Sequence, residues 1–288
     1  MMNQDLLFKN RVGVIATMHQ KERVMAPILE GELGIKIIVP PDLNTDLFGT
    51  FTREVKRMGT QIEAARYKAE QAIALTGETV AFASEGSFGP HPAIPYISAN
   101  REIVLLIDKA NNLEIIGQSL STDTNHSYQL VSSWEEAEKF AEKAGFPEHA
   151  LVVIIGDAAA GKGEIIKGIT SQAKLLEAVE YGLKNSPNGK VHLETDMRAM
   201  YNPTRMKNIE KATLDLIKKI NQTCPQCAWP GFEATERKKG LPCAVCYSMT
   251  QLTLLAIYEC KKCRYRQEQL FPDGRENADP SQCEYCNP

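Results

Sequence analysis

All eight cysteines of this 288-residue chain lie after residue 223, in four pairs of the form Cys-x-x-Cys. A Cys-x-x-Cys turn directs two thiolates at one metal ion, and a tetrahedral zinc site needs four thiolates. The pairs therefore predict two structural zinc sites, in a module too small to fold without its metal. The pairs are Cys224/Cys227, Cys243/Cys246, Cys260/Cys263 and Cys283/Cys286.

The order of the pairs leaves two arrangements for these sites. Fifteen residues separate Cys227 from Cys243, and nineteen separate Cys263 from Cys283. Both spacings are typical of zinc ribbons. The simplest prediction is sequential, with the first two pairs on one zinc ion and the last two on the other. An interleaved arrangement, first pair with third and second with fourth, stays open.

The bulk composition is that of an ordinary globular protein, with 43% hydrophobic residues and a net charge of −3. Without a membrane-spanning apolar run or a secretory signal, we expect a cytoplasmic protein and no membrane partner. Paired cysteines in a reducing compartment hold metal more often than they form disulfides, the minor alternative. The pairs also lack the helix N-terminus in a βαβ unit that favours redox activity.

Apolar, β-branched runs alternate with helical patterns over the first 220 residues, which predicts an α/β domain with a mixed or mostly parallel sheet. We place this domain at residues 1–221 and a zinc-ribbon-like domain at 222–288. The predicted strands are Val12–Thr17, Ile35–Val39, Thr79–Ala83, Ile103–Ile107, Leu113–Gly117, Leu151–Ile155 and Val191–Glu194. The predicted helices are Phe51–Leu75, Ser133–Ala144, Thr170–Leu183 and Pro203–Ile220.

Polar side chains follow several predicted strands, where ligands of α/β sheets usually bind. If these positions share one rim, they form a site for a small anionic or nucleotide-like ligand. Candidate acid/base or metal-binding groups are His19, Glu22, Glu85, His91 and Asp196. Candidate ligand-binding residues are Lys21, Asp46, Thr50, Ser87, Arg198 and Arg205. His19 and Glu22, spaced i, i+3, are also candidates for a divalent metal.

Each of these residues also has a purely structural explanation. His19 and Glu22 fit a solvated first turn of a helix, and Asp46 or Thr50 fits a helix cap. Glu85–Pro92 fits a connecting loop, and Asn202-Pro203 fits an N-cap followed by Pro at the first helical position. That helix end would equally attract an anion. The accumulation of such groups at many strand ends favours a ligand site.

The segment Gly156–Gly163 matches the pattern Gly-x-x-x-x-Gly-Lys after an apolar strand. A phosphate-binding P-loop needs Ser or Thr after the Lys and a helix that begins at once. Here Gly163 follows the Lys, and Glu164–Ile169 has the pattern of a strand. A hairpin turn is therefore the favoured prediction over a P-loop.

Several longer stretches together resemble an uncharacterised bacterial family classed as a domain of unknown function. They are Ala16–Glu22 (ATMHQKE), Thr45-Asp46 with Gly49-Thr50-Phe51, Glu85–Pro92 (EGSFGPHP), and Glu194–Ala199 (ETDMRA) with Asn202–Met206 (NPTRM). The resemblance covers most of the chain, including the Cys-Pro-x-Cys start of the metal module. It implies no activity, substrate or catalytic residue.

Two functions remain open. The first is an enzyme of the transferase or hydrolase kind, acting on a small anionic ligand at the strand-end rim. The second is a nucleic-acid or protein-binding module, because Arg237–Lys239 and Lys261–Arg266 form a local basic cluster in the zinc module. The net negative charge argues against a protein that wraps nucleic acid by charge alone, so we prefer the enzyme.

Overall fold

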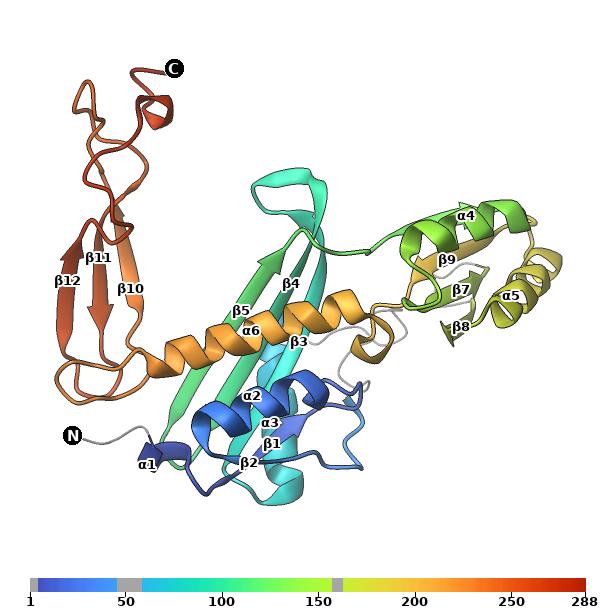
Figure 1. The fold of residues 1–288 in the computed structure, drawn as a ribbon, viewed down its shortest axis with the longest axis horizontal. Helices are drawn as coiled ribbons and strands as arrows, with labels where there is room; N and C mark the ends of the chain where they lie inside the picture. The colour runs from blue at the N-terminus through green and yellow to red at the C-terminus, as the bar shows by residue number, and fades with distance from the viewer. Residues whose placement is uncertain (1–4, 46–58, 157–162) are drawn as a thin grey trace. The chain divides into compact units, whose positions relative to one another are not determined.

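The computed structural model describes residues 5–45, 59–156 and 163–288 (Figure 1). The chain divides into two compact units. The larger unit comprises Phe8–Ile217, and the smaller one comprises Lys218–Pro288 together with the N-terminal residues up to Leu7. Asp5–Phe8 forms the short helix α1.

A five-stranded mixed sheet forms the first part of the larger unit. Its strand order is β2-β1-β3-β4-β5, with β1 parallel to β2 and β3, and with β3, β4 and β5 antiparallel. The predicted α/β class with a mixed sheet is therefore confirmed. The strands are β1 Val12–Ala16, β2 Lys36–Ile38, β3 Val80–His91, β4 Ile94–Asp108 and β5 Leu113–Ser121.

Small residues bring helices close to both faces of this sheet. On one face, the alanine stripe of α3 (Gln61–Thr76), which includes Ala65 and Ala69, packs on Ala81 and Ala83 of β3. On the other face, α6 (Pro203–Asn221) crosses β5 at Gly117, where a Cβ would be 2.6 Å from that of Leu216. Helix α2 (Glu22–Leu33) connects β1 to β2.

A second, four-stranded antiparallel sheet follows in the chain, in the order β6-β9-β7-β8. Helices α4 (Trp134–Ala144) and α5 (Gln172–Asn185) pack on it through a core that includes Phe140, Leu175 and Leu193. The strands are β6 Tyr128–Val131, β7 Leu151–Ile155, β8 Glu164–Ile169 and β9 Val191–Thr195, and the 3-10 helix η2 follows at Ala199–Tyr201.

Several ends of helices and strands agree with the local sequence patterns that predicted them. Ser133 caps α4 by accepting from the N–H of Glu136, although the Glu136 carboxylate accepts from Ser132 rather than from Ser133. The β7–β8 hairpin is confirmed, since Ile155 pairs with Glu164 in antiparallel register. Residues 157–162 of the P-loop-like segment lie outside the described residues.

The structure corrects several expectations about the elements and their boundaries. The strand predicted to end at Ala83 continues to His91, because β4 supplies hydrogen-bond partners along its whole length. The helix predicted from Phe51 begins at Gln61, after Thr60 and Glu63 form a capping box; residues 51–58 lie outside the described residues. Helix α2 was not predicted, and Pro27 lies inside it.

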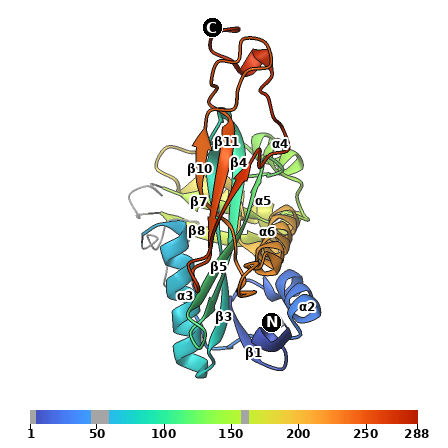
Figure 2. The same cartoon turned by 90° about the vertical axis from the view of Figure 1, so that its left-hand side faces the viewer.

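The smaller unit is built on a three-stranded antiparallel ribbon in the order β10-β11-β12 (Figure 2). The strands are β10 Ala234–Lys239, β11 Thr253–Glu259 and β12 Arg266–Leu270, followed by the 3-10 helix η3, Pro280–Gln282.

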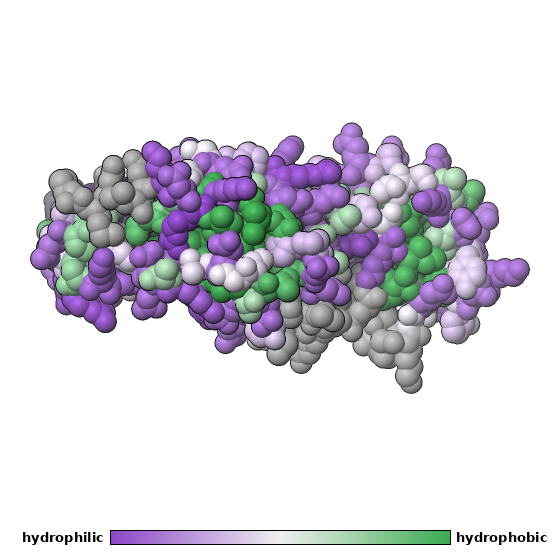
Figure 3. Space-filling view, turned by 90° about the horizontal axis from the view of Figure 1, so that it is seen from below, coloured by the Kyte–Doolittle hydropathy of each residue, from purple (hydrophilic) through white to green (hydrophobic). Residues whose placement is uncertain are grey.

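The face of the molecule in Figure 3 is mostly hydrophilic, with apolar side chains gathered in patches. Within the described residues, no helix is both long and apolar enough to cross a membrane.

Candidate metal centres and a buried charge cluster

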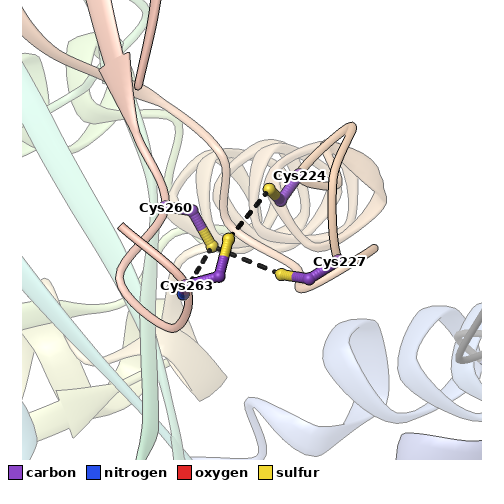
Figure 4. A group of neighbouring side chains, drawn as sticks. All are labelled: Cys224, Cys227, Cys260 and Cys263. Atoms are coloured by element: carbon purple, nitrogen blue, oxygen red, sulfur yellow. Dashed lines mark hydrogen bonds between the residues drawn. The ribbon is translucent and has the colours of Figure 1, made fainter. Parts of the chain in front are cut away.

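The eight cysteines form two groups of four, each with its sulfur atoms within 4.8 Å of one another. In the first group, Cys224 Sγ lies 3.7 Å from Cys263 Sγ, and Cys227 Sγ lies 3.6 Å from Cys260 Sγ (Figure 4). Four sulfurs bound tetrahedrally at about 2.3 Å from zinc would lie about 3.8 Å apart. The first group therefore has the geometry of a closed tetrahedral metal site.

The second group has the same geometry. Cys243 Sγ lies 3.8 Å from Cys286 Sγ, and Cys246 Sγ lies 3.6 Å from Cys283 Sγ. Each group offers four protein ligands, which leaves no coordination position for a substrate. Both groups can hold metal ions, and the chemistry supported by such closed sites is structural.

The sequential pairing of the cysteines is wrong, and the interleaved one is correct. The cause is the antiparallel ribbon. The start of β10 pairs with the end of β11, Ala234 with Tyr258, so the first and third cysteine pairs share one end of the ribbon. The second cysteine pair follows the C-terminal end of β10, and the fourth follows the C-terminal end of β12. Both of these strand ends lie beside the start of β11, at the opposite end of the ribbon. Since β10 spans about 20 Å, the first and second pairs cannot meet.

A repeated hydrogen bond shapes each Cys-x-x-Cys turn. The N–H four residues after the first cysteine donates to that cysteine's carbonyl. These donors are Ala228, Tyr247, Arg264 and Asn287, at 2.8, 3.1, 3.0 and 2.9 Å. The N–H groups of Val245 and Cys263 also approach the Sγ atoms of Cys243 and Cys260, both at 3.5 Å. Amide donors of this kind stabilise the negative charge of thiolates bound to a metal.

Several basic residues of the small unit have local partners. Lys262 Nζ lies 4.1 Å from the centre of the Trp229 ring, a cation–π contact. Ion pairs at 3.3, 3.2 and 2.9 Å hold the arginines: Arg264 with Glu259, Arg266 with Glu268, and Arg237 with Asp273. These partners reduce the positive potential that the local sequence suggests.

A topological switch point lies between β1 and β3. The chain leaves β1 toward β2 on one side and returns to β3 on the other, and ligands bind at the carboxyl ends of such strands. β3 continues beyond its last pairing with β1, Ala83 with Ala16. Beyond that point, side chains donate hydrogen bonds to backbone carbonyls of β3 in place of β1. Lys21 Nζ donates to the Ser84 carbonyl at 2.7 Å, and Gln61 Nε2 donates to the Glu85 carbonyl at 2.6 Å.

Five ionisable side chains are buried around this point, four of them on α3, β3, β4 and α6 and one in the loop before α2, and we name them the buried charge cluster. Lys68 is ion-paired with Glu85 on the α3 face of the sheet. Arg205 Nε donates to Glu102 Oε1 at 2.8 Å on the α6 face. These four residues and Lys21 each expose 7% or less of their surface to solvent. The cluster, with its three cations and two carboxylates, is Lys21, Lys68, Glu85, Glu102 and Arg205.

The position of Lys21 changes its acid–base chemistry. Burial lowers the pKa of its amine to about 7, and the nearby charges of Arg205 and Lys68 act in the same direction. The carboxylates of Glu85 and Glu102 oppose this shift without cancelling it. An amine with this pKa gains and loses a proton near neutral pH, which an exposed lysine does not.

Ser84 carries a buried hydroxyl without a hydrogen-bond partner among the described residues. It lies on β3, and its own carbonyl accepts the bond from Lys21. Buried polar atoms are nearly always hydrogen-bonded, because leaving one unpaired costs about 1–3 kcal/mol. A ligand or a water molecule beside the buried charge cluster would supply the hydrogen bond that the Ser84 hydroxyl lacks.

Asparagines continue the network on the α6 face. Asn100 Nδ2 donates to Glu102 Oε1 at 3.0 Å, and Asn208 Nδ2 donates to Asn100 Oδ1 at 3.0 Å. Asn202 caps α6 as predicted, since its Oδ1 accepts from the N–H of Arg205 at 2.9 Å. These bonds orient Glu102, the partner of the Arg205 guanidinium, and fix the backbone of Arg205 at the start of α6.

The family described as "Domain of unknown function (DUF6671)" matches residues 68–288. The chain belongs to this family. No characterised protein matches the sequence. The DUF6671 match includes both cysteine groups and four members of the buried charge cluster, whereas Lys21 precedes it. The resemblance noted from the sequence motifs is thereby confirmed at the level of a domain of unknown function.

The fold of this DUF6671 protein brings some of the predicted site residues together. Lys21, Glu85 and Arg205 all belong to the buried charge cluster. Asp196 and Arg198 form an ion pair at 2.6 Å, and Asp196 Oδ2 also accepts from the N–H of Gly168. Arg205 Nη1 donates to the carbonyl of Met197 between them, which links this pair to the cluster.

Other predicted residues lie apart from the cluster. His91 is at the tip of the β3–β4 hairpin, about 20 Å along the strand from Glu85. Ser87 is closer, since it lies on β3 two residues beyond Glu85 and its carbonyl accepts a long hydrogen bond of 3.5 Å from Asn100 Nδ2. Asp46 and Thr50 lie outside the described residues.

His19 and Glu22 do not share a helix face. His19 is buried in the loop after β1, and α2 begins only at Glu22. Within the described residues, no group of three or more metal-ligating side chains besides the two cysteine groups comes together. The divalent-metal site expected at His19 and Glu22 therefore has no further ligand there.

Sequence reasoning missed Lys68, Glu102 and the unpaired hydroxyl of Ser84. Lys68 had a visible signal, because it interrupts the alanine stripe that buries α3, three residues after Ala65. Glu102 directly precedes the apolar run of β4 and is fully buried. A charged residue inside a buried stripe predicts a buried partner, although not which one.

Proposed function

We propose that the larger unit is an enzyme that binds a small anionic ligand at the carboxyl end of β1, beside Ser84 and Glu85 of β3, and catalyses transfer or hydrolysis there. The observation that carries this proposal is the buried charge cluster, in which cations outnumber carboxylates at a topological switch point. Burying ionised side chains costs free energy, and apolar residues of similar size stabilise a fold as well or better. A ligand of opposite charge explains the surplus cation.

Lys21 is the central residue of this proposed site. Its ammonium form would attract the anion, and its amine form would accept a proton from a nucleophile or from water. The unpaired hydroxyl of Ser84 offers a hydrogen bond at the same place. The first turn of α2, which follows Lys21 directly, contributes the positive end of a helix dipole.

For the cysteine groups we propose zinc as the metal. Four thiolates at tetrahedral spacing suit zinc, and the closed geometry fits a bracing role for the small unit. The nucleic-acid alternative has weaker support, because the arginines that suggested it are ion-paired. Elemental analysis of the purified protein should find about two zinc ions per chain.

The enzyme proposal is tested by thermal-shift screening with inorganic phosphate, nucleoside mono-, di- and triphosphates, and small carboxylates. At least one of these anions should raise the melting temperature of the full-length protein. Lys21→Met should abolish the shift, whereas Lys36→Met, which removes an exposed cation from β2, should retain it. A full shift in the Lys21 variant, or no stabilising anion at all, would overturn the proposal. Turnover of the stabilising anion is then measured directly.

A further inference from the structure

A cavity of about 450 Å³ opens between α4 and α5 in the larger unit. It shares no residue with the buried charge cluster. Its walls are mainly apolar, from Trp134 on α4, Phe146 and Pro147 after α4, and Leu175 on α5. Its size and apolar lining are those of small-molecule sites in proteins, which usually add a few polar groups that orient the ligand.

The ionisable side chains that line this cavity have one sign. Among the described residues that line it, the only ionisable side chains are the carboxylates of Glu138 and Glu142. Trp134, Glu138 and Glu142 are spaced by four residues on α4, so they form one stripe along the helix. The arrangement combines the Trp134 indole and two carboxylates with apolar walls.

Glu138 and Glu142 carry the same charge one helical turn apart on α4. Like charges four residues apart on a helix repel by a few tenths of a kcal/mol. The polar contact to Glu138 is a long one, from Gln172 Nε2 at 3.5 Å. A cation between the carboxylates and the indole would remove the repulsion and gain a cation–π contact.

We propose that this cavity binds an organic ammonium ion carried on an apolar or aromatic body. The ammonium group would lie between Glu138, Glu142 and the Trp134 ring. The apolar body would be buried against Phe146, Pro147 and Leu175, which provides the hydrophobic part of the affinity. A small anion would be repelled from the same cavity, which distinguishes this site from the buried charge cluster.

The test uses phenethylammonium as the probe and the fluorescence of Trp134 as the signal. The chain has two tryptophans, so the titration is made in the full-length Trp229→Phe background. We expect a saturable change of Trp134 emission at millimolar probe or below. Glu138→Gln together with Glu142→Gln should weaken binding about tenfold or more. Glu180→Gln, an exposed change on α5 away from the cavity lining, should not.

The neutral analogue 2-phenylethanol separates a cation site from a merely apolar cavity. It should bind at least about tenfold more weakly than the ammonium probe, since it lacks the charge. Equal binding of the two probes, an unchanged affinity in the double glutamine variant, or no saturable signal would each overturn the inference. If Trp229→Phe loses its metal, the indole N–H signals of the unmodified protein, assigned with Trp134→Phe, provide the same readout by NMR.

Discussion

The guanidinium of Arg205 occupies the space that a side chain on Gly86 would need. A Cβ at Gly86 would lie 2.6 Å from Nη2 of Arg205 and would also collide with Glu102. The backbone at Gly86 does not have the positive φ that favours glycine, so space rather than conformation explains the residue. The absence of this one side chain allows the buried pair of Arg205 and Glu102 to form against β3.

Gly86→Ala should therefore break or displace a buried ion pair. We expect the free energy of unfolding to fall by about 3 kcal/mol, because an ionised group left without its partner in the core is costly. Urea denaturation of the full-length protein measures this loss. Gly89→Ala is the matched control on the same strand, since a Cβ there meets nothing within 4 Å. Equal losses in the two variants would contradict the steric explanation.

Lys21→Met should change how stability depends on pH. The pKa of Lys21 is lowered to about 7 in the folded protein, whereas an unfolded lysine titrates near 10.4. Between these values the unfolded state binds more protons, so wild-type stability gains a contribution as pH rises from about 7 to about 10. The Met variant lacks this contribution.

The measurement is the difference in unfolding free energy between wild type and Lys21→Met at several pH values. It should shift in favour of the wild type from pH 7 to pH 10, with the variant comparatively most stable near pH 6. A difference that stays constant over this range would show that Lys21 titrates like an exposed lysine.

The interleaved cysteine groups predict different metal contents for two quadruple Cys→Ser variants. Replacing Cys243, Cys246, Cys283 and Cys286 removes one whole group and should leave about one metal ion per chain. Replacing Cys224, Cys227, Cys243 and Cys246 removes half of each group and should leave little metal. Sequential pairing would give the opposite result, so elemental analysis of both variants decides between the arrangements.

The local ion pairs in the small unit predict weak binding to nucleic acid. Wild-type protein should show little affinity for DNA or RNA at physiological ionic strength, because the carboxylates of Glu259 and Glu268 offset the positive charge of Arg264 and Arg266. Fluorescence anisotropy with labelled oligonucleotides measures this at 50 and 200 mM salt. A steep, salt-dependent binding that disappears when Lys261, Lys262, Arg264 and Arg266 become Ala would instead support the nucleic-acid alternative.

The sequence by itself determined the features that depend on neighbouring residues. The Cys-x-x-Cys turns and the caps at Ser133 and Asn202 each arise from contacts within a few positions of the chain. Such contacts have fixed spacings, so a pattern of residue types is sufficient to predict them.

Only the tertiary structure decided which distant groups meet. The antiparallel register of β10 and β11 joined the first cysteine pair to the third, although the spacing between pairs also allowed a sequential arrangement. In the same way, packing of α3 and α6 on opposite faces of one sheet brought Lys68 to Glu85 and Arg205 to Glu102. These partners are far apart in the chain, and their meeting depends on strand order and helix packing, which no local pattern encodes.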